Sequence, residues 1–123
     1  MDLTIDGERS CRSVQSEFTS LYPFLKIDFF RTYDGSGRSL SRPERVSPHE
    51  PLRRFVRDSL PVTVNVEGGK TVSQVIKSFE EALPSLSAAV FRKSGTLWIE
   101  TTLTSDWTLD RQNREGEHLS KAF

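Results

Sequence analysis

Residues of the kinds that form disulfides or metal sites are scarce in this chain of 123 residues. Its single cysteine, Cys11, excludes an intrachain disulfide. A structural zinc site needs four cysteine or histidine ligands, and the chain adds only His49 and His118. The sequence also shows no nucleophile next to an activating base. We therefore expect no metal, no cofactor and no catalytic residue, which favours a protein that is not an enzyme.

Long apolar runs and an excess of one charge are also lacking. No stretch approaches the length needed to cross a membrane, and the N-terminal segment MDLTIDGERS has no basic region followed by an apolar run. We expect a cytoplasmic protein with no membrane partner. Lys and Arg number 17, as do Asp and Glu, so the formal net charge is zero. Since proteins that bind phosphate backbones carry a basic excess, this balance disfavours nucleic acid as a partner.

Two similar segments, Ser10–Arg31 and Thr71–Arg92, form the main pattern in the sequence. An offset of 61 positions superposes identical or similar residues along both. The matching pairs are Val14 with Val75, Phe18 with Phe79, Pro23 with Pro84, Leu25 with Leu86, Phe30 with Phe91, and Arg31 with Arg92. This repetition predicts an internal duplication and marks the shared apolar positions as core. Cys11 aligns with Val72 on an apolar stripe, so we interpret it as a small buried hydrophobic residue.

Hydrophobic periodicity and turn residues predict the elements of each half. Those of the first half are a strand at Leu3–Ile5, a helix from Ser10 ended by Pro23, a strand at Leu25–Phe30, a loop at Thr32–Val46 with a degenerate strand near Leu40 as the alternative, and a helix from Ser47 to Leu60. Those of the second half are a strand at Val62–Val66, a helix opened by a Thr71–Gln74 capping box and ended by Pro84, a strand at Leu86–Lys93, a turn at Ser94-Gly95, a strand at Thr96–Leu103, and a short helix that begins at Asp106 or Thr108, runs through Gln112 and stops at Gly116.

This order of elements predicts an α+β fold built from a duplicated β-α-β unit. Each unit needs a right-handed crossover between its strands. Two such units side by side predict a mixed sheet with the helices mainly on one face, a ferredoxin-like arrangement with an added hairpin strand. We expect a single domain, 1–123, made of two similar halves, 1–60 and 61–116, and a short C-terminal tail, 117–123.

The hairpin expected around Ser94-Gly95 organises the candidate binding residues. A turn at these two residues pairs Phe91 with Trp98. Strand alternation places Val90, Leu97 and Ile99 on the face under the helices. The opposite face is expected to carry six candidate binding residues: Lys26, Phe30, Phe91, Lys93, Trp98 and Glu100. We interpret Asp28, on the same face, as a surface charge.

A glycine-containing turn, Gly68-Gly69-Lys70-Thr71, follows a predicted strand and opens a helix, as a phosphate-binding loop does. That motif needs another glycine five residues before Gly69, where this chain has Val64. We therefore interpret the segment as a turn followed by a helix cap.

Two segments of the chain resemble a small bacterial family: YPFLKIDFF at Tyr22–Phe30 and FRKSGTLWIETTLTSDWTLDRQN at Phe91–Asn113. Members of that family pair a stretch like FPYLKIEFF with one like FRKSGNVWLETT, followed by Trp-Thr-Leu and Gln-Asn. The resemblance covers most of the chain outside Asp34–Glu44 and implies a bacterial protein. It transfers no catalytic residue, because the family has no assigned activity.

Two functions remain open for the mixed aromatic and charged face. The first is a non-enzymatic module that binds a protein partner or forms a homo-oligomer, which the neutral charge favours. The second is single-stranded nucleic-acid binding. Its contacts would be base stacking on Phe30, Phe91 and Trp98 and phosphate contacts to Lys26, Arg31, Lys93 and the Arg53-Arg54-Arg57 cluster. The competing interpretation is that a helix, a loop or a second subunit covers these rings.

Overall fold

The described residues form a succession of short strands and helices. The computed structural model describes residues 1–6, 8–33, 38–55 and 61–121. In order, the elements are β1 (Asp2–Ile5), α1 (Cys11–Leu21), β2 (Leu25–Tyr33), β3 (Ser39–Arg45), the 3-10 helix η1 (Leu52–Phe55), β4 (Val62–Asn65), α2 (Val72–Ala82), β5 (Leu86–Ser94), β6 (Leu97–Glu100), the 3-10 helix η2 (Thr102–Thr104) and α3 (Leu109–Lys121). The expected α+β class is confirmed.

The first two helices form where side chains cap their N-termini. α1 follows Ser10 and α2 follows Thr71, and each cap side chain accepts a backbone N–H of the first turn. At α2 the Gln74 side chain completes the predicted capping box, which is confirmed. Pro23 and Pro84 lie just past the last turns, where proline terminates a helix.

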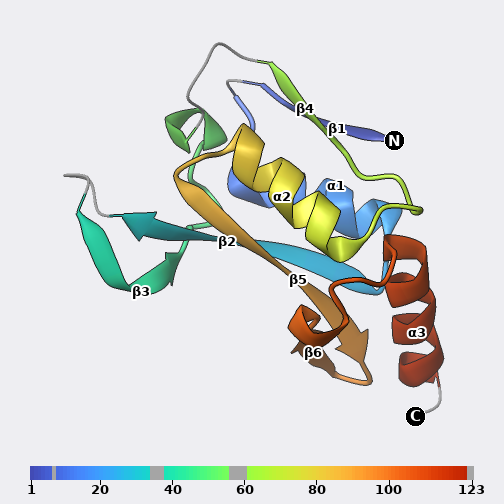
Figure 1. The fold of residues 1–123 in the computed structure, drawn as a ribbon. Coiled ribbons are helices and arrows are strands. Elements are labelled where there is room, and N and C mark those ends of the chain that lie inside the picture. The colour runs from blue at the N-terminus through green and yellow to red at the C-terminus, as the bar shows by residue number, and fades with distance from the viewer. Residues whose placement is uncertain (7, 34–37, 56–60, 122–123) are drawn as a thin grey trace.

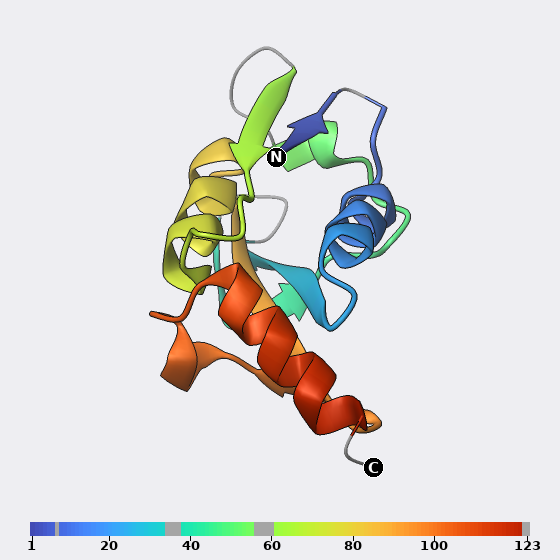
Figure 2. The ribbon, with the colours of Figure 1, turned by 90° about the vertical axis from the view of Figure 1, so that its right-hand side faces the viewer.

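The helices α1 and α2 lie between two antiparallel sheets (Figure 1). The larger sheet has four strands in the order β3-β2-β5-β6, and the smaller one pairs β1 with β4. Figure 2 shows α1 and α2 on opposite sides of the molecule beneath the β1–β4 pair. α3 packs against β5. The larger sheet therefore has one face under helices and one face turned away from them.

The mixed sheet expected from the element order is wrong, because all strand pairs among the described residues are antiparallel. β1 and β4 form a ladder of their own, from Asp2 opposite Asn65 to Ile5 opposite Val62. Leu3 and Ile5 are fully buried in the core shared with the helices, so burial of apolar side chains holds this pair away from β2. A ferredoxin-like arrangement, which would place these strands in the larger sheet, is not confirmed.

The ladder between β2 and β5 is symmetric. Its end pairs are Leu25 with Arg92 and Arg31 with Leu86. At the offset of 61 positions, Leu25 is equivalent to Leu86 and Arg31 to Arg92, so each end pair joins a leucine of one half to an arginine of the other. The two halves therefore meet at this ladder with equivalent residues in equivalent places.

A single hydrophobic core forms between the layers. Phe18 of α1 and Phe79 of α2 are fully buried in it, and the Phe79 ring meets Phe29 of β2 edge-on at a centroid distance of 5.4 Å. Cys11 is fully buried as well. The expectations that both phenylalanine rings share one core and that Cys11 is buried are confirmed.

The stretch Thr32–Val46 is not the loop that its composition predicts. β2 continues into it, and Ser39–Arg45 forms β3, which pairs with β2. The alternative of a strand near Leu40 is therefore confirmed. Pro43 is tolerated because β3 is an edge strand, where a missing N–H does not interrupt a ladder on both sides. Residues 34–37, the centre of the expected loop, lie outside the described residues.

The helix expected from Ser47 to Leu60 is wrong over its described part, where only η1 forms a single short turn. The carbonyls of Pro48 and Glu50, which would bond within such a helix, instead accept N–H groups at the start of α1. Pro51 has no N–H to donate and would break the interior of a helix. The rest of the expected helix, residues 56–60, lies outside the described residues.

The β5–β6 hairpin turns one residue later than predicted, at Gly95-Thr96 rather than Ser94-Gly95. Gly95 takes a φ of 64°, a backbone conformation that glycine adopts without strain. β6 also ends before the predicted Leu103. The next residue, Thr101, donates both its N–H and its hydroxyl to the carbonyl of Val90, and the 3-10 helix η2 follows it.

The last helix, α3, passes through Gly116, where the sequence predicts a stop. A Cβ at Gly116 would lie 2.9 Å from Cβ of Phe24, so the glycine allows close helix packing here and does not end the helix. Thr108, one of the two predicted caps, accepts an N–H of the first turn. Residues 117–121 belong to α3, so the expected tail is wrong there, and 122–123 lie outside the described residues.

Replacing either core ring by alanine is expected to destabilise the fold by similar amounts. Phe18→Ala and Phe79→Ala each remove a fully buried aromatic side chain, so the free energy of unfolding should fall by about 3–5 kcal/mol. Chemical denaturation measures this loss, with Leu103→Ala, at a position 98% exposed, as the control. A loss below about 1 kcal/mol for either ring would contradict the shared core.

Candidate functional site

The predicted binding residues lie on the face of the larger sheet that is turned away from α1 and α2. Ile27, Phe29 and Val90 are buried under the helices, so alternation turns their strand neighbours the other way. In the observed registers these neighbours include Lys26, Phe30, Phe91, Lys93, Trp98 and Glu100. We refer to these six residues as the open face.

Five residues of the open face are neighbours, and Phe30 lies apart. The register pairs Lys26 with Phe91, Phe91 with Glu100, and Lys93 with Trp98. Phe30 pairs with Ser87 toward the other end of the β2–β5 ladder. The direct pairing expected between Phe91 and Trp98 is wrong, because the turn lies one residue later. Both rings still share a face, since Trp98 moves by two positions along β5 and alternation has a period of two.

Lys26 joins the two nearer rings. Its Nζ lies 5.2 Å from the ring centroid of Phe91 and 5.3 Å from that of Trp98, within cation–π range. The same Nζ lies 3.8 Å from Oδ2 of Asp28. The ring-to-ring contacts found in the described part of the chain join core aromatic residues, Phe18 with Tyr22 and Phe29 with Phe79, and not residues of the open face. The face is therefore a lysine held between two rings and a carboxylate, not a cluster of stacked aromatics.

The edge strand β6 exposes apolar side chains to both sides. Leu97 is 67% exposed, Trp98 37% and Ile99 43%. Leu97 and Ile99 have the strand parity of buried Val90, so the expectation that they share its face is confirmed, but both side chains are exposed. β6 is the outermost strand of the sheet, whereas the helices pack mainly against β2 and β5, so the β6 side chains stay exposed.

A groove of about 600 Å³ opens beside the open face. One wall is the outer side of α1, with Arg12 and Gln15, and its floor is the first part of β2, with Lys26 and Asp28. Trp98 lines it from β6. β3 pairs with β2 only from Phe30 onward, so this part of the strand edge lies next to side chains of α1 and not next to another strand.

Asp28 at the floor of the groove is buried, with 7% of the residue exposed, although alternation predicts a surface charge. Its Oδ1 accepts a 2.9 Å hydrogen bond from Nε2 of Gln15, which also donates to the carbonyl of Ile27. Its Oδ2 lies 3.3 Å from an Arg45 guanidinium nitrogen. Gln15, Asp28 and Arg45 come from three separate elements, so strand parity alone gave no signal for this arrangement.

Comparison with known proteins adds no relative. No family model matches the chain, and no curated protein or solved structure matches it. Among the described residues, no helix combines the length and the apolar character needed to cross a bilayer.

The glycine turn before α2 is packed against an acidic side chain. A Cβ at Gly68 would collide with the carboxylate of Asp110, whose own N–H donates to the Gly68 carbonyl. A phosphate placed here would meet this negative charge. The interpretation of the segment as a turn and helix cap agrees with this packing.

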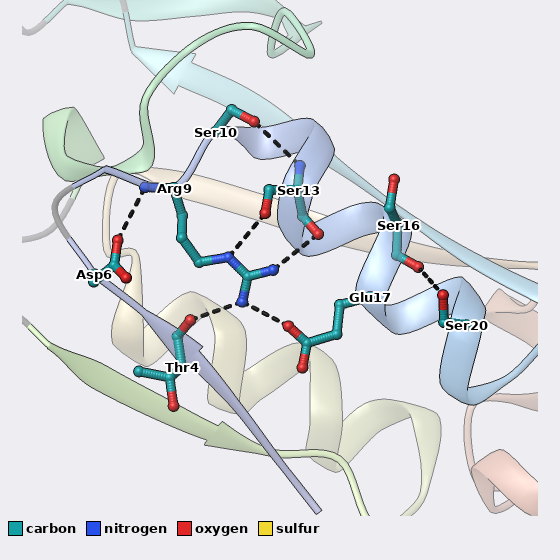
Figure 3. Close-up of polar contacts among 8 residues, drawn as sticks. All are labelled: Thr4, Asp6, Arg9, Ser10, Ser13, Ser16, Glu17 and Ser20. Atoms are coloured by element: carbon teal, nitrogen blue, oxygen red, sulfur yellow. Dashed lines mark hydrogen bonds and ion pairs between the residues drawn. The ribbon is translucent and has the colours of Figure 1, made fainter.

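A second polar cluster surrounds Arg9 and serves to hold α1 in place (Figure 3). The guanidinium donates to the Thr4 carbonyl, to the hydroxyl and carbonyl oxygens of Ser13, and to Glu17 at 2.7 Å. These bonds link β1 to the first two turns of α1. Since its donors are directed at the protein itself, this cluster is structural.

Two buried acidic groups keep their protons well above neutral pH. Burial raises the pKa of the Cys11 thiol to about 11, with smaller contributions from the carboxylates of Asp28 and Glu50. Burial, followed by Asp110 and Glu67, raises the pKa of Tyr22 to about 12. A thiol in this state is a poor nucleophile, so Cys11 acts as a core residue.

Stability is therefore expected to fall at alkaline pH. Below the ordinary pKa values of 9.0 for Cys11 and 10.0 for Tyr22 both groups are protonated in the folded and unfolded chains. As the pH rises toward the folded values of about 11 and about 12, only the unfolded chain releases these protons, which favours unfolding. Urea denaturation at a series of pH values measures this slope. Cys11→Val, which introduces the residue found at the equivalent position 72, should remove the part of the slope that begins near pH 9.0. An unchanged slope in this variant would contradict the raised pKa of Cys11.

Proposed function

We propose that the chain is a non-enzymatic interaction module that associates with protein through the open face and strand β6. The observation that carries the proposal is the exposure of three consecutive apolar residues on an edge strand, with Leu97 at 67%, Trp98 at 37% and Ile99 at 43%. Edge strands of this composition pair with other chains unless something blocks them.

The opposite edge of the same sheet has the composition of a protected edge. β3 carries Arg42, Pro43, Glu44 and Arg45, all exposed. Charges and proline are the usual means of blocking edge pairing. β6 has neither a charge nor a proline along Leu97–Ile99. The sheet therefore has one edge, β3, that is protected against pairing with another strand and one edge, β6, that is not.

A second copy of this chain is the partner that the surface fits best. Two β6 strands paired antiparallel about a two-fold axis would place apolar residues against apolar residues from both sides. The formal net charge of zero removes the long-range repulsion that keeps charged proteins apart. Single-stranded nucleic acid stays the alternative, with Lys26 and Lys93 beside the rings of Phe91 and Trp98.

We also infer that the two halves arose by duplication, which the equivalent caps, the matching prolines and the symmetric β2–β5 ladder support. Membership of the small bacterial family that the sequence resembles is likewise a proposal.

Trp98→Ala is expected to weaken self-association by at least about tenfold, because truncating a central aromatic residue of an interface has an effect of that order. Light scattering and sedimentation over a range of concentrations measure it. The free energy of unfolding should fall by clearly less than it does for Phe18→Ala, since the Trp98 ring is 37% exposed and the Phe18 ring is fully buried. Arg42→Ala on the other edge is the matched control.

Three results would overturn the proposal. A chain that stays monomeric at about 1 mM has no useful self-affinity. A loss of several kcal/mol in the Trp98→Ala monomer would show that the ring belongs to the core. Binding of a random single-stranded oligonucleotide with a steep salt dependence would favour the alternative instead.

A further inference from the structure

The backbone groups of β6 divide between the two sides of the strand. The N–H of Thr101 donates to the carbonyl of Val90, so Ile99, which has the same parity as Thr101, turns its backbone groups inward to β5. Trp98 and Glu100, the alternate residues, turn theirs outward to the free edge of the sheet. A second strand that pairs with this edge must therefore bond to Trp98 and Glu100.

This parity leaves two registers for a second copy of β6 paired antiparallel about a two-fold axis. Outward backbone groups must meet outward backbone groups, so one residue of β6 lies opposite its own copy at the axis. An axis at Glu100 would place two carboxylates opposite each other, and an axis at Leu97 would run the second strand into the hairpin turn. The residue at the axis is therefore Trp98 or Ile99.

Charge distinguishes these two registers. With Ile99 at the axis, Glu100 of one copy lies opposite Trp98 of the other, and Lys93 is next to that Trp98 on β5. Neighbouring strands are about 4.8 Å apart, so the backbones of Glu100 and Lys93 would lie roughly 10 Å apart, a span that their two long side chains bridge. With Trp98 at the axis, the same row would hold Lys93 of both copies and no acidic residue.

Glu100 and Lys93 are both available for such a contact. Among the ion pairs formed by the described residues, none includes either of them. Glu100 is exposed, and its carboxylate accepts a hydrogen bond from the hydroxyl of Thr102. The two-fold axis would bring these opposite charges together twice, so charge complementarity favours the register with Ile99 at the axis.

The first half of the chain carries the same edge in a blocked form. Arg31 pairs with Glu44 on β3, and its equivalent in the second half, Arg92, pairs with Ile99 on β6. Glu44 is therefore the counterpart of Ile99, and it forms a 3.0 Å ion pair with Arg31. A charge on an edge strand opposes pairing with another chain, whereas Ile99 is apolar and 43% exposed. The sheet is thus extendable at one edge, which limits the assembly to two chains.

We propose that two copies of this chain form a closed dimer in which the β6 strands pair antiparallel with Ile99 on the two-fold axis and Glu100 of each copy approaches Lys93 of the other. The proposal rests on the self-association proposed above and adds its register and its stoichiometry. Two four-stranded sheets become one continuous sheet that ends in β3 on both sides. Ile99 faces its copy in a non-hydrogen-bonded pair, with Cα atoms about 4.5 Å apart.

Cysteine cross-linking of the full chain tests the register, in a Cys11→Val background that removes the native thiol. Ile99→Cys should form a disulfide-linked dimer with oxidised glutathione, because a disulfide needs Cα atoms within about 7 Å. Leu97→Cys is the matched control, since it lies on the same face of β6 and is more exposed, at 67%. Its two copies would lie more than about 10 Å apart and should stay unlinked on a non-reducing gel.

Sedimentation of charge variants tests the contacts. Ile99→Glu gives β6 the residue that β3 carries, so it should weaken association at least about tenfold, because two carboxylates would meet at the axis. Lys93→Glu and Glu100→Lys should each weaken association, and the two together should restore it, since the exchange returns opposite charges to each row. Lys77→Glu, on the exposed side of α2, is the matched control and should leave association unchanged.

The outcomes separate this proposal from the proposed function. A chain that stays monomeric contradicts both. If the parent dimerises but Ile99→Cys links only in a mixture with Leu97→Cys, Trp98 lies at the axis and only the register is wrong. Equal linking of the two single variants, or an exchange of charges that fails to restore association, also overturns the register alone. Assemblies larger than a dimer would show that β3 does not block its edge and would overturn the closed dimer.

Discussion

The antiparallel ladder between β2 and β5 is the constraint on which the rest of the structure depends. It runs from the Leu25–Arg92 pair to the Arg31–Leu86 pair and joins the two halves of the chain. One face of it carries the apolar residues that α1 and α2 bury, and the β1–β4 pair closes the core beyond the helices. The other face is open because neither α1 nor α2 crosses to it. The placement of both candidate surfaces follows from this one-sided covering.

The edges of the ladder are completed differently in the two halves. Beside β2, side chains of α1 take over backbone groups that a neighbouring strand would otherwise satisfy: Gln15 donates to the Ile27 carbonyl and Thr19 to the Leu25 carbonyl. Beside β5, Glu80 accepts the Ala88 N–H instead. Buried backbone groups need partners in both places, and helix side chains supply them. The helix side chains that do so differ between the two halves: Gln15 and Thr19 beside β2, and Glu80 beside β5.

Sequence patterns predicted the elements whose formation depends on residues that are close together in the sequence. The caps at Ser10 and Thr71, the stops at Pro23 and Pro84, and the buried strand face needed only neighbouring residues, and the structure has them. Elements that depend on distant partners were predicted only as an alternative, as for β3, or with the wrong end, as for α3. Polar β3 is a strand because β2 pairs with it, and α3 passes Gly116 because Phe24 lies against it. Asp28 was misjudged for the same reason: alternation gave its face, but Gln15 and Arg45 enclose it.

Trp98 stands where the β6 edge and the groove beside α1 meet, and strand alternation explains why. Its side chain leaves β6 on the open face and lines the groove, whereas Leu97 and Ile99 leave on the other side of the same strand. A partner that pairs with the β6 edge would contact all three, whereas of these three only Trp98 lines the groove. Any change at Trp98 therefore affects both surfaces together. Ile99, on the β6 edge, and Asp28, which lines the groove from β2, each belong to one surface and not to the other.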